Sequence, residues 1–172
     1  MTAYAIRTLT PDDWRDFSSI RLEGLKNYPH FFGSTHATEC AYTQTDWQNW
    51  LSKKDGALFG LYHNNAIIGT TGLITTNEDP TMGLMIASYI SPAHQRKGLS
   101  SKLYEARLAW AAAFKQWKTL RVSHRDGNEA SRRANQKWGF VYVHSLSKTW
   151  PDGITADNLY YELDLEQLRQ KS

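Results

Sequence analysis

Residues 95–101 of the chain read Gln-Arg-Lys-Gly-Leu-Ser-Ser. An apolar run that ends near Ile90 precedes this stretch, and a run of helix-forming residues at 102–110 follows it. Small residues in such a loop let successive backbone N–H groups converge on one point, and the start of a helix adds the positive end of its dipole. Two basic residues of the loop add formal charge. The segment therefore predicts a strand, an anion-binding loop and a helix, with a phosphate or pyrophosphate as the ligand.

Two common nucleotide-binding loops are excluded by the residues present. The chain has no Gly-x-x-x-x-Gly-Lys-Ser/Thr sequence and no Gly-x-Gly-x-x-Gly followed by an acidic residue about twenty positions later. The loop alone leaves one alternative open, which is an ordinary helix start with a basic turn.

A second motif occupies residues 128–140, which read Asn-Glu-Ala-Ser-Arg-Arg-Ala-Asn-Gln-Lys-Trp-Gly-Phe. Asn128 is a preferred helix N-cap residue, Gly139 can end the helix, and Phe140 would open the next strand. A helix and a strand at 119–124 separate the two motifs. The spacing therefore predicts a strand-helix-strand-helix unit.

Together the two motifs resemble those of the GNAT family, the Gcn5-related N-acetyltransferases. Gln95, Gly98 and Ser100 match the Gln/Arg-x-x-Gly-x-Gly/Ala signature, with serine as a mild departure in the last place. Residues 128–140 are similar to the family's Asn-x-x-Ala/Ser-x-x-x-Tyr-x-x-x-Gly-Phe element. The resemblance extends over nearly the whole chain, residues 4–165.

The periodicity of the apolar residues and the resemblance predict the same order of elements, β-α-α-β-β-β-α-β-α-β-β. We expect strands at 4–9, 57–62, 66–74, 82–90, 119–124, 140–150 and 158–165, and helices at 11–27, 45–53, from about 100, and from 128 to 139. The fold class is then α/β (α+β). The resemblance implies a mixed, mostly antiparallel central sheet of six to seven strands, flanked by about four helices and splayed between strands 4 and 5.

Composition favours a soluble globular protein with one domain over residues 1–172. The chain has 41% hydrophobic and 22% charged residues and a formal net charge of +3. Its single cysteine, Cys40, cannot form an internal disulfide, and no metal-ligand spacing occurs, so we expect a reducing compartment and no metal. Without a signal peptide or a long apolar run, the expected location is cytoplasmic, with no membrane partner. Arg132 and Arg133 lack the neighbouring aromatic strip of a nucleic-acid site, so we expect no nucleic-acid partner either.

The resemblance implies acetyl-CoA (coenzyme A) as acyl donor and a small-molecule or peptide amine as acceptor. The pantetheine arm would lie between strands 4 and 5, where the N–H of Ile90 would polarise the thioester carbonyl. Asn128 would contact the arm from the start of its helix. The residues that would hold the pyrophosphate are Gln95, Arg96, Lys97, Gly98, Leu99, Ser100 and Ser101.

Both catalytic positions of the family are altered in this chain. Strand 82–90 has no carboxylate where many relatives carry a glutamate base, and His124 at the end of strand 119–124 is the best substitute. His124 could instead continue the core face of Leu120 and Val122. Asn135 stands where most relatives carry a tyrosine acid, and an amide can donate a hydrogen bond to sulfur but cannot supply a proton.

Several weaker candidates complete the predicted site. Glu23, Glu39 and Glu78 could act as bases through water; Tyr104 and Tyr142 could replace the missing acid; Arg21, Phe31, Phe32 and residues 150–154 could meet the substrate. The predicted function is acetyl-CoA-dependent N-acetyl transfer by direct attack of a primary amine on the thioester. Because both catalytic positions are altered, the alternative is a protein that binds coenzyme A with little or no turnover. Homodimerisation is also compatible with the sequence, because the family often dimerises and the C-terminal strands offer a sheet edge for pairing.

Overall fold

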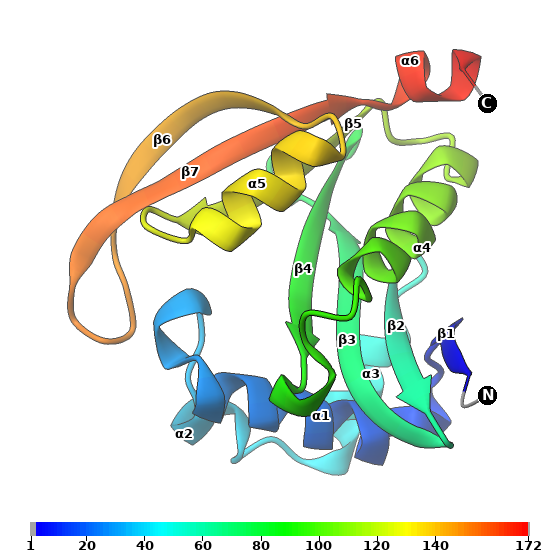
Figure 1. The fold of residues 1–172 in the computed structure, drawn as a ribbon, viewed down its shortest axis with the longest axis vertical. Coiled ribbons are helices and arrows are strands. Elements are labelled where there is room, and N and C mark those ends of the chain that lie inside the picture. Colours follow the sequence, from blue (N-terminus) through cyan, green and yellow to red (C-terminus); the bar gives the residue numbers. More distant parts are fainter. Residues whose placement is uncertain (1–2, 172) are drawn as a thin grey trace.

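The computed structural model describes residues 3–171. Its centre is a seven-stranded mixed sheet with the order β1-β2-β3-β4-β5-β7-β6 (Figure 1). The strands are β1 (Tyr4–Thr8), β2 (Gly56–His63), β3 (Ala66–Thr75), β4 (Met82–Ile90), β5 (Thr119–Arg125), β6 (Val141–Thr149) and β7 (Thr155–Asp164). Neighbouring strands are antiparallel except for β4 and β5, which are parallel. The predicted fold class is confirmed.

Six α-helices and three short 3-10 turns surround this sheet in the described part of the chain. The helices are α1 (Trp14–Asn27), α2 (His36–Glu39), α3 (Gln44–Leu51), α4 (Ser100–Ala113), α5 (Glu129–Lys137) and α6 (Leu165–Gln170), and the turns are η1 (Pro11–Asp13), η2 (Pro29–Phe31) and η3 (Pro92–His94). The sequence predicted about four helices. It missed α2 and α6 because they are too short to show a helical repeat of apolar residues.

The local signals for helix ends are found where the sequence predicts them. The Asn128 side chain accepts a hydrogen bond from the N–H of Ser131 and so caps α5. Gly139 follows α5 with a φ of +88°, the left-handed conformation that glycine adopts without strain. Asp164 caps α6 in the same way as Asn128 caps α5, which ends the last strand one residue before the predicted boundary.

The sheet buries apolar side chains on both of its faces. Leu58 of β2 packs in one cluster with Phe17 of α1 and Trp47 of α3. Its neighbour Phe59 belongs to a second cluster, with Tyr104 of α4 and residues of β3, β4 and β5. Because side chains alternate along a strand, these two clusters lie on opposite faces, one under α1 and α3 and the other under α4. No helix in the described residues is long and apolar enough to cross a bilayer.

Strands β4 and β5 separate soon after they begin to pair. Their parallel register joins Met82–Leu84 to Thr119–Arg121, and no pairing follows beyond it. Farther along β4, the register with β3 shifts, so that Ala87 and Ser88 both lie opposite Thr71. Ala87 has a φ of +56° at this bulge. The predicted splay between strands 4 and 5 is therefore confirmed, and the bulge lies on its β4 side.

Candidate functional site

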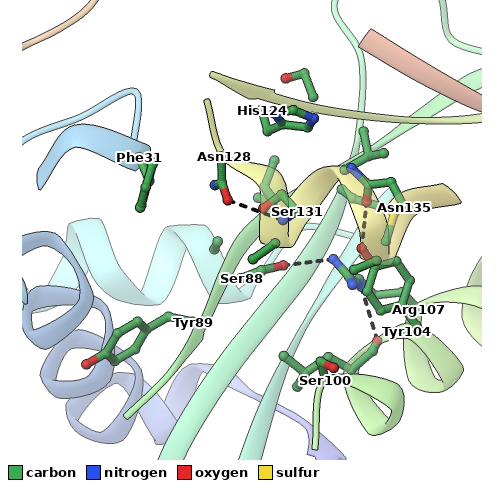
Figure 2. A pocket seen from close by; sticks show the side chains of 18 of the residues that line it. Phe31, Ser88, Tyr89, Ser100, Tyr104, Arg107, His124, Asn128, Ser131 and Asn135 are labelled. Atoms are coloured by element: carbon green, nitrogen blue, oxygen red, sulfur yellow. Dashed lines mark hydrogen bonds between the residues drawn. The ribbon is translucent and has the colours of Figure 1, made fainter. Parts of the chain in front are cut away.

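A pocket of about 400 Å³ opens where β4 and β5 part. Its walls come from β4, β5, the starts of α4 and α5, and the η2 segment that follows α1. Figure 2 shows Phe31 of η2 at one end of this pocket and Arg107 and Asn135 at the other. The pocket thus connects the side of the sheet that carries α1 with the side that carries α4.

The predicted anion-binding loop leads into α4 at the edge of this pocket. Arg96 and Gly98 have φ values of +58° and +72°, which turn the chain sharply in front of the helix. Among the described residues, the N–H groups from Arg96 to Leu99 have no backbone acceptor. Ser100 begins α4 and lines the pocket. Free N–H groups and a helix N-terminus together form a surface that can bind an anion.

Gln95 connects this loop to the rest of the site through its side chain. Its amide Nε2 donates to the carbonyl of Ile90 at 2.8 Å and lies 3.2 Å from the hydroxyl oxygen of Tyr28. The side chain therefore joins the loop to the end of β4 and to the residue that ends α1. Arg96 and Lys97 are exposed, whereas Leu99 is buried in a cluster with Leu61 and Leu103.

The residues predicted to contact the pantetheine arm line the pocket from two sides. Ile90 is the last residue of β4 and pairs with Gly69 of β3. Asn128 lies across the pocket at the start of α5, with its Oδ1 already used as the helix cap. The structure therefore brings Ile90, Ser100 and Asn128 together around one cavity.

His124 lies in the pocket wall and is only 7% exposed. Its Nδ1 is 2.8 Å from the carbonyl oxygen of Arg125, and its Nε2 is 3.3 Å from the hydroxyl of Tyr161. A carbonyl can only accept, so Nδ1 carries the proton and Nε2 presents its lone pair. Leu120 and Val122 are buried on the same side of β5 as His124. His124 therefore both lines the pocket and continues the core face of the strand.

Asn135 and Tyr104 meet at the inner end of the pocket. The Tyr104 hydroxyl donates to Asn135 Oδ1 at 2.6 Å, and both residues are buried. Burial raises the pKa of Tyr104, so its hydroxyl stays protonated at neutral pH. Asn135 Nδ2 is buried and has no hydrogen-bond partner among the described residues. The amide that replaces the family's tyrosine thus has free donors.

Arg107 is a pocket residue that sequence reasoning missed. It is 2% exposed, its Nε donates to the carbonyl of Leu103 at 3.1 Å, and its Nη1 donates to Ser88 Oγ at 2.8 Å. Its guanidinium lies 4.4 Å from the ring centre of Tyr104. A signal was present in the sequence, because Arg107 shares a helical face with apolar residues, three positions after Tyr104 and four before Ala111.

Glu23 and Tyr89 form a hydrogen-bonded group beside the end of β4. Glu23 Oε1 accepts from the Tyr89 hydroxyl at 2.8 Å and from the Ser91 hydroxyl at 2.6 Å. Burial, followed by the bond to Glu23, raises the pKa of Tyr89 to about 12. Tyr89 also lines the pocket, so it connects the Glu23 carboxylate to the cavity. The sequence pointed to Glu23 without revealing these partners.

The remaining candidates divide between the pocket and the supporting structure. Phe31 and Phe32 line the pocket. Arg21 and Glu39 are both buried and form an ion pair of 2.7 Å with each other, so neither is free to meet a ligand. Tyr142 is half exposed on β6 and contacts the Tyr161 ring edge-on, outside the pocket lining.

The sheet opens at its parallel pair, and a glycine-containing loop precedes the next helix, as the resemblance to the GNAT acetyltransferases implies. The model of the acetyltransferase (GNAT) family matches residues 14–140. The chain therefore belongs to the GNAT acetyltransferase family, and the predicted resemblance is confirmed. No curated protein sequence matches the chain.

Solved structures with the same fold cover nearly the whole chain. A GNAT-family acetyltransferase from Streptococcus pneumoniae is 19% identical, with 94% of this chain and 99% of that chain covered and a TM-score of 0.81. The Salmonella typhimurium protein YncA, solved with acetyl-CoA, is 18% identical (95% and 94% covered, TM-score 0.79). Spermidine N-acetyltransferase from Vibrio cholerae, solved with CoA and spermine, is 15% identical (95% and 96% covered, TM-score 0.76). At these identities the likeness shows the fold.

Proposed function

We propose that the chain is a single-domain, acetyl-CoA-dependent N-acetyltransferase over residues 1–172, and that a primary amine attacks the thioester directly. The observation that carries this proposal is the continuity of the loop with the pocket. Free N–H groups from Arg96 to Leu99 lie at the head of α4, and the pocket begins there and runs between β4 and β5. Family membership and the relatives solved with acetyl-CoA or CoA support the same ligand.

In this proposal the loop holds the pyrophosphate of coenzyme A. Backbone N–H groups of residues 96–99 and the side chains of Ser100 and Ser101 would supply donors, while Arg96 and Lys97 would supply charge. Gln95 would act by holding the loop against Ile90. The pantetheine arm would take the place of a strand along β4 beyond Leu84, where β5 no longer pairs, with Ile90 and Asn128 beside it.

The chemical step requires a neutral amine. An amine with a pKa near 10.4 is neutral at pH 7 at a cost of roughly 4 to 5 kcal/mol, which a general base lowers. We assign this role to His124, because the bond from Nδ1 to Arg125 leaves the lone pair of Nε2 to accept a proton. The Tyr161 hydroxyl, 3.3 Å from Nε2, is its present partner, and the incoming amine would replace it. Glu23, reached through Tyr89 or Ser91, is the second candidate base.

The leaving group is the thiolate of coenzyme A. The new C–N bond forms as the C–S bond breaks, and the amine gives up one proton. A thiol with a pKa near 8.5 leaves as thiolate without great difficulty, and one of the two Nδ2 hydrogens of Asn135 can hydrogen-bond to the sulfur. The acceptor amine, a small molecule or a peptide, would approach from the end of the pocket that carries Phe31 and Phe32.

The proposal is tested in two stages with the full chain. First, thermal unfolding is measured with acetyl-CoA at about 100 times its dissociation constant, with ATP and NAD as polyanion controls. A stabilisation of roughly 2.7 kcal/mol raises the midpoint by about 5 to 10 °C. Equal shifts with all three ligands would contradict the loop assignment.

Second, thiol release is followed with a panel of primary amines. Turnover with any amine, reduced at least tenfold by His124→Gln, supports the enzyme and its base. Binding without turnover for the whole panel would instead identify a coenzyme A-binding module.

A further inference from the structure

The inner end of the pocket carries a buried positive charge that the protein does not neutralise. Arg107 is 2% exposed, and no ion pair joins it to a carboxylate among the described residues. Burial lowers the pKa of Arg107 to about 10, so the guanidinium is still charged at neutral pH. A buried charge without a counter-ion is strongly unfavourable. An anion that arrives with a ligand would remove this penalty.

The groups around Arg107 can donate more hydrogen bonds than the protein accepts. Of the guanidinium nitrogens, Nε bonds to the Leu103 carbonyl and Nη1 to Ser88, and the guanidinium also interacts with the Tyr104 hydroxyl, so its described partners are all uncharged or protonated groups. Asn135 Nδ2 is likewise buried without a partner, because Tyr104 takes the Oδ1. Figure 2 shows these side chains gathered at one end of the pocket. Such a set of donors matches the oxygens of a carboxylate.

The position of Arg107 indicates which substrate would carry that carboxylate. Arg107 lies two turns along α4 from Ser100, or about 10 Å at 1.5 Å per residue, on the helix that starts at the proposed pyrophosphate site. Its partner Ser88 lies in the β4 bulge, two residues before Ile90, whose N–H would polarise the thioester carbonyl. Phe31 lies at the opposite end of the pocket. The charge therefore faces the acyl group rather than the incoming amine.

We propose that the enzyme also accepts, and prefers, coenzyme A monothioesters of short dicarboxylic acids, with the free carboxylate of the acyl group bound by Arg107 and Asn135. This inference rests on the proposed function. The amine nitrogen bonds to the thioester carbonyl carbon, the C–S bond breaks, and coenzyme A leaves as the thiol after taking up the proton that the amine loses. The distal carboxylate is unchanged in the amide product.

The test compares succinyl-CoA with butyryl-CoA, which has the same number of acyl carbons and no charge. Product amide is measured by mass spectrometry, with an amine that the enzyme acetylates and with enzyme-free controls. We expect kcat/KM for succinyl-CoA to exceed that for butyryl-CoA by about tenfold or more, as two charge-assisted hydrogen bonds allow. Arg107→Gln should bring this ratio to one or below, and Arg107→Lys should keep part of it. Because both donors are assayed on one preparation, a misfolded fraction cancels in the ratio.

Asn135→Asp provides a second variant if Arg107→Gln does not fold. A carboxylate at position 135 would neutralise Arg107 within the protein, so the ratio should again fall. A ratio of one between the kcat/KM values for succinyl-CoA and butyryl-CoA in the unmodified protein would overturn the proposal. An equal loss of kcat/KM for both thioesters in Arg107→Gln would overturn it as well.

An amine comparison decides whether the bound carboxylate belongs to the acyl donor or to the acceptor. If the enzyme prefers an amino acid over the corresponding decarboxylated amine, and Arg107→Gln removes that preference, the carboxylate belongs to the acceptor and the proposal is wrong. If no coenzyme A thioester shifts the unfolding midpoint, the proposed function itself fails. If the enzyme turns over acetyl-CoA but does not prefer succinyl-CoA to butyryl-CoA, the proposed function stands and only the carboxylate site at Arg107 is wrong.

Discussion

The side-chain amide of Gln95 donates a hydrogen bond to the main-chain carbonyl of Ile90 at 2.8 Å, which fastens the anion-binding loop to the end of β4. Gln95→Ala removes this bond and frees the loop. A net hydrogen bond contributes about 1 kcal/mol, so we expect the dissociation constant for coenzyme A to rise about fivefold. Isothermal titration calorimetry of each variant with coenzyme A measures this dissociation constant directly.

Gln116→Ala is the matched control for this change. Gln116 also donates from Nε2 to a main-chain carbonyl, that of Pro80 at 2.9 Å, but outside the pocket lining. This variant should lose comparable stability and keep its affinity for coenzyme A. Equal affinities in both variants would mean that Gln95 does not position the loop.

Gly98→Ala tests whether the loop conformation is required. Gly98 has a φ of +72°, and a Cβ there would meet nothing within 4 Å, so the cost is backbone strain alone. An L residue in the left-handed region loses roughly 1 to 2 kcal/mol. Gly127 has a φ of +89° with the same open space, so Gly127→Ala should lose similar stability in urea unfolding. Only Gly98→Ala should weaken coenzyme A binding, and equal affinities for the two variants would contradict the loop assignment.

Breaking the ion pair between Arg21 and Glu39 should destabilise the protein strongly. Both side chains are buried, and Glu39→Gln leaves the Arg21 guanidinium without a charge partner. Such a loss costs about 3 to 5 kcal/mol in urea unfolding, whereas replacing both partners by Met and Leu should recover much of it. Glu129→Gln, which breaks an exposed pair with Arg132, should change stability very little. A small effect of Glu39→Gln would show that the pair is solvated.

The contact between Arg125 and Asp152 should make stability depend on pH in the acid range. The bond from Arg125 lowers the pKa of Asp152 from 3.8 to about 2. Since the folded value lies below the unfolded one, the stabilisation is complete above about pH 5 and disappears as pH falls through 3.8 toward 2. Urea midpoints of the unmodified protein and Asp152→Asn should therefore converge as the pH is lowered from 6. A difference that stays constant with pH would contradict this.

The parts of the site that depend on local sequence could be predicted. The loop, the Asn128 cap and the Gly139 helix end each follow from a few adjacent residues, and the alternation of Leu120, Val122 and His124 along β5 follows from strand geometry. These features need no knowledge of distant segments.

Contacts between distant segments could not be predicted in the same way. Tyr89 and Glu23 are 66 residues apart, and Tyr104 and Asn135 are 31 apart. No periodicity in either segment indicates its partner. Arg107 shows the same limit, because a charged residue on a buried helical face signals an unusual environment without saying which cavity it faces.

Strand order governs when this sheet can be completed during synthesis. In the described sheet β6 forms one of the two edges and pairs with β7, which follows it in the chain and separates it from β5. During translation β6 therefore leaves the ribosome before any strand that can pair with it. Val141, Val143 and Leu146, which stay exposed even in the finished fold, are then unprotected on an unpaired strand. During this interval, which ends once β7 has emerged and docked on β5, the chain is open to chaperones or to aggregation.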